Sequence, residues 1–374
     1  MVASPEDRQR IERLMRVADV LARMARLVEP VLPRQVQPAV ALGATLAEDV
    51  VVSTERPAAP LALIDGWAVR AEVTTDGSSY TPAALAGAES IDVGEAMPPG
   101  TDAVVATDAV AMRGGVAEAL APVAPGDGVL QAGADAGHRE VLRRAGERLR
   151  ASDLAAMRSL GIGSARVRRP RLLIGRARTH RDPISDAVVA WLTQAVSTDG
   201  GEPLTGVAGA HMPTLLSGPN ADAFVIVGGT GSGREDHAVL TLARLGTVEV
   251  HGVAVSPGET TAFGIANSRP VLLLPGRLDA AIAGWLMVGR AMLARLRGGT
   301  DDEYGTTATM ARKVASTVGL TEMVLVQRTD DGLVPLAAKY LPITAFGNAD
   351  GWILIPAASE GYPAGATVSV RPLP

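Results

Sequence analysis

The sequence contains no cysteine, only two lysines and few aromatic residues. Without cysteine the chain can form no disulfide, hold no metal or iron–sulfur cluster through thiolates and use no thiolate nucleophile. Lys313 and Lys339 are the only lysines among 35 basic residues, so an anion would have to be bound by arginine forks. The formal net charge of −5 disfavours non-specific binding of nucleic acid.

A targeting signal and long apolar runs are also missing. Residues 1–10 are charged and lack the apolar core of a signal peptide. The most apolar helical run, residues 280–289, is far shorter than the roughly 20 residues that span a membrane. We therefore expect a soluble, cytoplasmic protein with no membrane partner and no nucleic-acid partner. Because 47% of the residues are hydrophobic, the chain can bury large cores.

The first half of the chain predicts one helix followed by a strand-rich module. Ser4 is placed to cap the helix, and apolar residues recur at helical spacing over Ile11–Ala25, as on a face that packs in a core or a subunit interface. Residues 40–130 consist of short β-branched runs broken by Gly, Pro, Asp and Ser, which is typical of a small β module. A short helix is expected over Asp153–Leu160.

From residue 171 onward, buried strands alternate with helices. The strands show no polar–apolar alternation, which indicates a parallel sheet covered on both faces. Residues 298–302 are expected to link it to a small β domain. The expected strands are Arg171–Gly175, Ala223–Val227, Val250–Val255, Val271–Leu274, Met323–Val326, Trp352–Ile355 and Thr367–Val370, and the helices are Ile184–Val196, Glu235–Leu245 and Leu278–Leu296.

A glycine-rich loop, Gly228-Gly229-Thr230-Gly231-Ser232-Gly233, lies between a buried strand and an expected helix. Glycines let backbone N–H groups converge at the carboxyl end of a strand, beside the positive end of a helix. The loop favours an anion site over a purely structural turn. It is neither a dinucleotide fingerprint nor a Walker loop, because no lysine follows the glycines. Asp236, in the expected first helical turn, could cap the helix or hold a metal or polar ligand.

An arginine cluster surrounds the end of the first strand of the expected sheet. Seven arginines and one histidine occur over residues 166–181, without any acidic residue. Arg176, Arg178 and Arg181 follow the strand at the edge where the glycine loop is expected, which predicts a phosphate or oxyanion site. The alternative is a solvated arginine-rich loop.

Two Pro-Gly pairs end later strands of the same expected sheet. Pro257-Gly258 and Pro275-Gly276 could carry backbone past a ligand at this edge. Both could equally be ordinary turns that end a strand.

Short motifs also occur in a fixed order from about residue 35 to the C-terminus. Residues 65–70 (DGWAVR) resemble the signature MDGYAVR, and residues 94–105 resemble TGAPVPEGADAVV. The later matches are residues 133–135 with GED, 154–161 with L..LGI, 228–236 with GGVSVGxxD, 257–258 with KPGKP, 274–276 with LPGNP and 348–365 with a C-terminal domain. Together they resemble the MoeA and gephyrin E-domain family, the molybdopterin molybdenumtransferases.

The resemblance implies an elongated homodimer that inserts molybdate into adenylylated molybdopterin, with a divalent metal such as Mg²⁺, and releases AMP. Its ligand would be molybdopterin or adenylyl-molybdopterin, and a molybdoenzyme or another cofactor-biosynthesis protein would be a further partner. The implied fold class is multidomain α/β plus β, with a doubly wound, molybdopterin-binding-like α/β domain, a β-rich module and a small C-terminal β domain. The expected domain limits are 1–50 with 131–166 for the N-terminal helix and linker, 51–130 for the β module, 167–299 for the α/β domain and 300–374 for the last domain.

The motif positions and the predicted anion site together give the candidate site residues. Catalysis is expected of Asp65 and Asp236, and metal binding of Asp102 and Asp135. Ligand binding is expected of Gly228, Gly229, Thr230, Gly231, Ser232, Gly233, Arg176, Arg178, Asp186, Pro257, Gly258, Pro275 and Gly276.

Several positions depart from the family pattern, and acids are prominent among the residues lost. Arg176–His180 stands for TGDEL, Val93 for the threonine of TGAP, Ala134 for the glutamate of GED, Val188 for the asparagine after Asp186, Gly209-Ala210 for an aspartate pair, Ser256–Thr260 for KPGKP and Pro275–Leu278 for LPGNP. Mg²⁺ needs carboxylate or phosphate oxygens, whereas arginine offers only donors. The remaining aspartates could still assemble a metal site across the dimer. Three hypotheses stay open: a divergent molybdenum-insertion enzyme, a non-catalytic molybdopterin-binding carrier, chaperone or sensor, and a structural or interaction protein that kept the fold and lost the ligand.

Overall fold

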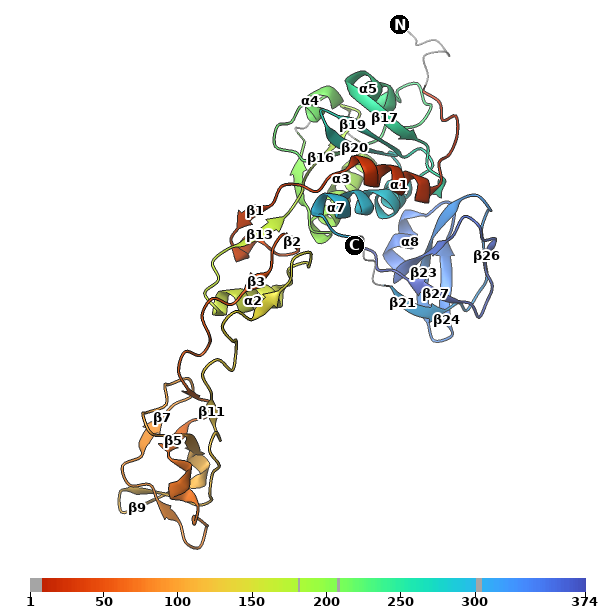
Figure 1. The fold of residues 1–374 in the computed structure, drawn as a ribbon. Coiled ribbons are helices and arrows are strands. Elements are labelled where there is room, and N and C mark those ends of the chain that lie inside the picture. Colours follow the sequence, from red (N-terminus) through yellow and green to blue (C-terminus); the bar gives the residue numbers. More distant parts are fainter. Residues whose placement is uncertain (1–8, 181, 207–208, 301–304) are drawn as a thin grey trace. The chain divides into compact units, whose positions relative to one another are not determined.

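The computed structural model describes residues 9–180, 182–206, 209–300 and 305–374 (Figure 1). The chain divides into two compact units. Unit 1 comprises Met1–Glu48, Ala145–Ala151 and Ser164–Pro374, and unit 2 comprises Asp49–Arg144 and Ser152–Gly163. The multidomain α/β plus β fold class is confirmed, whereas the limits of the four expected domains stay a prediction. Among the described residues, no helix is long and apolar enough to cross a membrane.

A six-stranded sheet forms the centre of unit 1. Its strands are β14 (Arg171–Arg176), β15 (Glu202–Thr205), β16 (Ala223–Val227), β17 (Gly246–His251), β19 (Ala262–Ala266) and β20 (Arg269–Leu274). They lie in the order β15-β14-β16-β20-β19-β17, in which the first four are parallel and the last two join antiparallel. β16 is buried along its whole length, as its continuous apolar sequence predicts.

Helices cover both faces of this sheet (Figure 1). They are α1 (Val17–Leu27), α3 (Pro183–Thr198), α4 (Met212–Leu216), α5 (Ala238–Leu245), α6 (Leu278–Gly284), the π-helical turn η5 (Trp285–Gly289) and α7 (Arg290–Arg297). Alternate residues of β16 enter separate cores. Val225 and Val227 pack in the core that α1, α3, α6 and α7 share, whereas Phe224 and Ile226 pack with α4 and α5. The prediction of a sheet covered on both faces is therefore confirmed.

The antiparallel edge of the sheet differs from the prediction of parallel strands alone. β19 and β20 form a hairpin whose turn residues Asn267 and Ser268 both have positive φ, at 50° and 59°. Turns of this kind match the twist of the flanking strands, so the hairpin closes without a crossover helix. The expected strand Val250–Val255 is wrong in its limits, because β17 ends at His251 and Val255 begins the separate strand β18 (Val255–Ser256).

The limits of three expected helices also change. The helix start expected at Ser4 lies outside the described residues, and the described helix begins only at Val17. The preceding segment is extended because the Met15 N–H donates to the Gly252 carbonyl at 3.0 Å, and strand-like pairing replaces the helix. α5 begins at Ala238 instead of Glu235, and the long helix expected from Leu278 is interrupted by η5.

The C-terminal part of unit 1 is a small β domain, as predicted. Its elements are β21 (Thr306–Thr309), β22 (Val314–Ala315), β23 (Thr321–Thr329), β24 (Gly332–Ala337), α8 (Ile343–Asn348), β25 (Gly351–Ile355), β26 (Gly361–Tyr362) and β27 (Thr367–Val370). The three strands expected here lie within β23, β25 and β27. β18 pairs with β23 in parallel, so the α/β part and the C-terminal strands share backbone hydrogen bonds.

The remaining elements are short. In unit 1 they are β1 (Arg34–Val36), η2 (Pro38–Val40), β2 (Thr45–Leu46) and β13 (Ala165–Arg168). Unit 2 contains β3 (Val50–Val51), β4 (Leu61–Ala62), β5 (Gly66–Val69), η3 (Ala71–Thr74), β6 (Ala83–Ala84), β7 (Glu89–Ile91), β8 (Ala103–Ala106), η4 (Thr107–Ala109), β9 (Val110–Arg113), β10 (Val116–Ala119), β11 (Val129–Leu130) and β12 (Val141–Arg143). α2 (Ala151–Ser159) covers the helix expected near residue 153. Unit 2 thus has the strand-rich texture that its sequence predicts.

Candidate functional site

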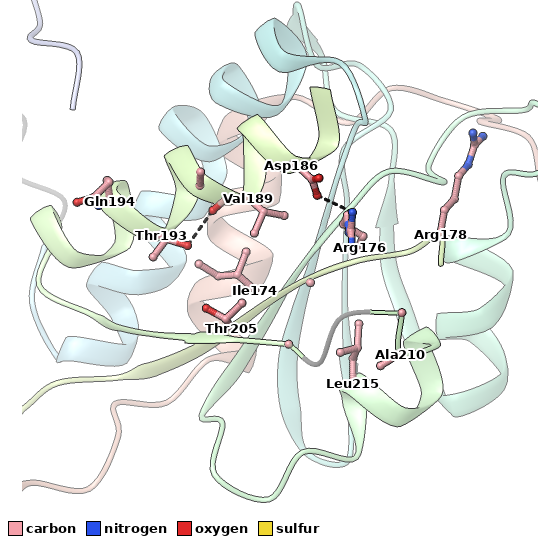
Figure 2. A pocket seen from close by; sticks show the side chains of 14 residues that line it. Ile174, Arg176, Arg178, Asp186, Val189, Thr193, Gln194, Thr205, Ala210 and Leu215 are labelled. Carbon is pink, nitrogen blue, oxygen red and sulfur yellow. Dashed lines mark hydrogen bonds and ion pairs between the residues drawn. The ribbon is translucent and has the colours of Figure 1, made fainter. Parts of the chain in front are cut away.

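Two pockets lie at the carboxyl end of β14, and both belong to unit 1. The loop pocket has a volume of about 410 Å³ and is lined by Gly228–Gly231, Asp236, Pro275, Gly276 and Arg277. The α3 pocket has a volume of about 430 Å³ and is lined by Ile174, Asp186, Val189, Thr193, Thr205 and Leu215 (Figure 2). Arg176 and Arg178 line both pockets. The structure therefore brings the predicted arginines and the predicted glycine loop to one place.

The glycine loop turns sharply at the end of β16. Gly228 and Gly229 have φ of 88° and 71°, a region that side chains disfavour. A Cβ on Gly229 would lie 3.1 Å from the Cβ atoms of both Ala177 and Ala238, so the turn also depends on close packing. These glycines allow the chain to reverse direction directly at the pocket.

The carbonyl groups of the loop are held by hydrogen bonds. The Gly229 carbonyl accepts from the Ala238 N–H at 3.0 Å, and His251 Nε2 lies 3.1 Å from the Thr230 carbonyl oxygen. By contrast, the backbone N–H groups of residues 229–232 have no hydrogen-bond acceptor among the residues that the structure describes. Successive donors without an acceptor can form a nest for an anion, and three of these residues, Gly229–Gly231, line the loop pocket.

Asp236 holds the outer end of the loop. Its Oδ2 accepts from the Gly233 N–H at 3.0 Å, and its Oδ1 accepts from Arg178 Nη2 at 2.9 Å. It precedes α5 instead of standing in the first helical turn, where the sequence predicts it. Ser232 and Gly233 complete the loop beyond the pocket lining.

The arginines of the pockets are paired with carboxylates. Arg176 Nη1 lies 2.5 Å from Asp186 Oδ1, and Arg178 also lies near Glu235, with 3.3 Å between Nη1 and Oε2. A guanidinium has five N–H donors, and these pairs use only one or two of them. Each arginine can therefore bind an anion in the pocket while its carboxylate partner stays in place.

Arg277, which the sequence analysis did not select, completes the rim of the loop pocket. Its Nε and Nη2 donate to the two oxygens of Asp279 at 3.1 and 2.6 Å, and this hydrogen-bonded carboxylate raises the pKa of Arg277. Asp279 is buried and also accepts from the Leu341 N–H at 3.2 Å. The guanidinium lies 5.3 Å from the centroid of the Tyr340 ring. The sequence did contain a feature that could have identified Arg277 as a site residue: it directly follows Pro275-Gly276, at a position where the family pattern has asparagine.

The first turn of α3 also contributes to the loop pocket. Asp182 caps the helix, with its Oδ1 accepting from the Ile184 and Ser185 N–H groups at 3.1 and 2.9 Å. The Ser185 hydroxyl donates to Oδ2 at 2.5 Å, and this bond lowers the pKa of Asp182. The cap fixes the start of the helix that carries Asp186.

The rest of the arginine cluster has other roles. Arg166 and Arg168 lie on β13, and Arg169 Nη1 donates to the Val40 carbonyl at 2.8 Å. Arg171 pairs with Asp222, with 3.2 Å between Nη2 and Oδ1, and Arg181 lies outside the described residues. Among the described arginines of the cluster, only Arg176 and Arg178 line the two pockets, and His180 also lines the loop pocket.

The first Pro-Gly pair, Pro257-Gly258, lies outside the lining of the two pockets. Pro257 and Gly258 are buried, and a Cβ on Gly258 would lie 3.1 Å from the Ala280 carbonyl of α6. Thr260, which follows them, lines the loop pocket, and its hydroxyl lies 2.8 Å from that of Thr230. Pro275 and Gly276 line the loop pocket as expected.

The three remaining candidate aspartates belong to unit 2. Asp65 Oδ1 accepts from the Val93 N–H, and Asp102 Oδ1 accepts from the Ala71 N–H, each at 2.7 Å. The Asp135 N–H donates to the Arg56 carbonyl at 3.0 Å. Their catalytic and metal-binding roles stay predictions.

The carboxylates do not by themselves form a magnesium site. Nowhere in the described ranges do three His, Asp or Glu side chains gather as metal ligands would. Asp186 and Asp236 pair through Oδ1 with Arg176 and Arg178, and these donors compete with Mg²⁺ for the carboxylate oxygens. These residues therefore fit an anion better than a resident cation.

Comparisons with known proteins identify proteins with a similar sequence and fold. Residues 15–161 match the model described as the MoeA N-terminal region (domain I and II), and residues 172–295 match one described as a probable molybdopterin binding domain. Two crystal structures of a molybdopterin biosynthesis moeA protein from Pyrococcus horikoshii have TM-scores of 0.74 and 0.72, at 23% and 26% identity. Both cover 96% of this chain, and the alignments span 100% and 99% of those chains. A Methanocaldococcus jannaschii protein named for molybdopterin biosynthesis is 28% identical over 372 residues, with 88% of this chain and 89% of that protein covered.

Proposed function

The chain belongs to the MoeA family, whose members act in molybdenum cofactor biosynthesis, and we propose that it binds molybdopterin or adenylyl-molybdopterin at the two pockets of unit 1. The observation that carries this proposal is the glycine loop, which lines a pocket rimmed by arginines and in which the N–H groups of residues 229–232 have no acceptor among the described residues. Phosphate oxygens are acceptors only, so they complement a wall of donors. The phosphate end of the ligand would occupy the loop pocket.

The α3 pocket suits the heterocyclic end of the same ligand. Ile174, Val189 and Leu215 give it apolar walls, and Gln194 and Thr205 add polar groups that can fix the orientation of a ring. Mostly apolar walls with a few polar groups are typical of small-molecule pockets. Because Arg176 lines both pockets, one ligand could contact both and place its phosphate beside the shared guanidinium.

Two activities are compatible with this binding mode. As an enzyme, the protein would insert molybdate into adenylylated molybdopterin and release AMP. As a carrier, chaperone or sensor, it would bind the pterin without turnover. The pairing of Asp186 and Asp236 with arginines favours the second activity, because carboxylates that would hold a divalent metal are already engaged. In both cases the protein would act as a homodimer and would have a molybdoenzyme that receives the cofactor as a partner.

A binding and turnover experiment separates these outcomes. The purified protein is titrated with molybdopterin and with adenylyl-molybdopterin, and AMP release is then followed after addition of molybdate and Mg²⁺. Release of AMP supports insertion, and binding without release supports the carrier. Absence of binding to either ligand would overturn both and leave a structural role.

A further inference from the structure

The chain's N-terminal segment reaches the glycine loop through one side chain. Gln9 is buried, and its Nε2 donates to the Gly229 carbonyl at 2.7 Å and to the Gly231 carbonyl at 2.6 Å. Its Oε1 accepts from the Val239 N–H at 3.2 Å. A residue more than two hundred positions away in sequence thus contacts the loop and also the first turn of α5.

These contacts fix the orientation of the loop's peptide groups. In a trans peptide, the carbonyl of one residue and the N–H of the next point in opposite directions. Because Gln9 binds the carbonyls of Gly229 and Gly231, the N–H groups of Thr230 and Ser232 are directed away from Gln9. These are two of the four N–H groups without an acceptor in the described part of the chain.

Further contacts hold the segment that carries Gln9. Met15 pairs with the strand region at Val253, and the Ala254 N–H donates to the Met15 carbonyl at 2.8 Å. Ile11 packs over Gly252, where an added Cβ would lie 2.5 Å from Ile11 Cγ2. The segment is therefore anchored at Ile11 and at Met15, which holds Gln9 against the loop.

We propose that Gln9 is a positioning residue for the anion site. Its amide binds the loop carbonyls on one side so that the loop N–H groups stay directed to a phosphate on the other. Gln9 itself does not line the loop pocket, so it acts through the loop and not by touching the ligand. The inference rests on the proposed function for the identity of the natural ligand. The positioning role of Gln9 itself applies to any phosphate group in the loop pocket.

The first test compares a phosphorylated and a phosphate-free ligand. Gln9→Met keeps the length of the side chain and removes all three hydrogen bonds, and Gln9→Glu keeps an acceptor for Val239 but has no donor for the carbonyls. Both variants should bind molybdopterin about tenfold more weakly. Both should bind the phosphatase-treated pterin within about twofold of the wild type, because the phosphate is the group that the loop N–H groups recognise. An equal loss for the two ligands, or no loss, would overturn the inference.

The matched control is Gln35→Met. Gln35 Nε2 donates to the Ser164 hydroxyl at 2.7 Å at an exposed position, outside the lining of either pocket. This variant should bind both ligands as the wild type does. Thermal unfolding of all variants identifies any general loss of fold, which would weaken both ligands together.

The second test uses inorganic pyrophosphate and does not depend on the pterin. Addition of pyrophosphate to the labelled wild-type protein should shift the amide NMR signals of Thr230, Gly231 and Ser232, and the shifts should be lost in Gln9→Met. Equal shifts in both proteins, or none in the wild type, would overturn the inference. If the wild type binds pyrophosphate but no pterin, the proposed function fails while the role of Gln9 stands.

Discussion

Arg176 and Asp186 form an ion pair in which Nη1 lies 2.5 Å from Oδ1, and Arg176 belongs to the walls of both pockets (Figure 2). The Arg176 side chain is 13% exposed, so it is held largely out of water. The pair balances the charge of the guanidinium in the absence of a ligand. Replacing one partner or the other should therefore change the affinity for the ligand in opposite directions.

Replacement of the guanidinium should weaken binding. Arg176→Gln should reduce the affinity for molybdopterin about 10- to 100-fold, because a hydrogen bond to a charged group contributes about 1.5–3 kcal/mol. The measurement is the dissociation constant from a fluorescence titration. Arg171→Gln is the matched control on the same strand, where the arginine pairs with Asp222 outside both pockets. A similar loss in the two variants would contradict a local role for Arg176.

Replacement of the carboxylate should strengthen binding. Asp186→Asn removes a negative charge beside the phosphate position and leaves Arg176 in excess, so the affinity for molybdopterin should rise about threefold to tenfold at low salt. The gain should shrink at high ionic strength, which screens the charge. Dissociation constants at two salt concentrations test this. If Asp186 instead held a metal or a polar group of the ligand, the same variant would bind more weakly.

The turn at Gly229 should not accept a side chain. Gly229→Ala combines a positive φ of 71° with Cβ contacts at 3.1 Å, so the loop must shift and phosphate-dependent binding should be lost. Stability should fall by about 1–2 kcal/mol from the backbone conformation alone. Gly365→Ala is the control, since Gly365 has a φ of 83° and open space around it. The control should share the stability loss and keep the affinity, and equal affinities in the two variants would contradict the packing argument.

The cap at Asp182 predicts a dependence of stability on pH. Asp182→Ala should lower the free energy of unfolding by about 1 kcal/mol at neutral pH, as is usual for a lost N-cap. The hydrogen bond from Ser185 lowers the pKa of Asp182 below its ordinary value of 3.8, so the carboxylate stabilises the fold above that pH. The difference between wild type and variant should fade as the pH falls through the lowered pKa. Urea unfolding from pH 7 to pH 3 measures it, and a constant difference would contradict the charge-based cap.

The π-helical turn leaves no room for a methyl group at Gly289. A Cβ there would lie 2.3 Å from Cε3 of the buried Trp285 ring, so Gly289→Ala should lower the free energy of unfolding by about 1–3 kcal/mol. Gly299→Ala, with open space around it, should change stability by less than about 0.5 kcal/mol. Thermal unfolding of the pair tests this. Equal melting temperatures for the two variants would show that the ring can move.

Local sequence determines much of the fold. The apolar run of β16 and the glycines directly after it predict a buried strand and a tight turn, because both depend on neighbouring residues. The antiparallel edge could have been predicted in part, since Asn267 is typical of a two-residue hairpin turn. Residues 11–15 have helical spacing but form an extended segment, because Gly252 and Ala254 supply backbone partners that no local pattern reveals.

The residues of the candidate site also fall into those that the local sequence predicts and those that it does not. The glycine loop and Arg176 were predicted because their position follows from the ends of adjacent parallel strands. Gln9 was missed, because a glutamine in a charged N-terminal segment has no local feature that indicates contact with Gly229. The pairing of Arg178 with Asp236 was missed for a similar reason, since the two residues come from different strand ends.

The buried carboxylate of Asp279 has a consequence for protein engineering. It receives hydrogen bonds from Arg277 at the pocket rim and from the backbone of Leu341, which precedes α8. The α/β domain is therefore not a separable module, although its sheet and loop are continuous in sequence. A fragment that ends at the predicted linker near residue 300 would lose one of the groups that hold Asp279, and with it the setting of Arg277. Ligand affinities measured on such a fragment would be those of a loop pocket with an altered rim, and they should not be taken as the affinities of the whole chain.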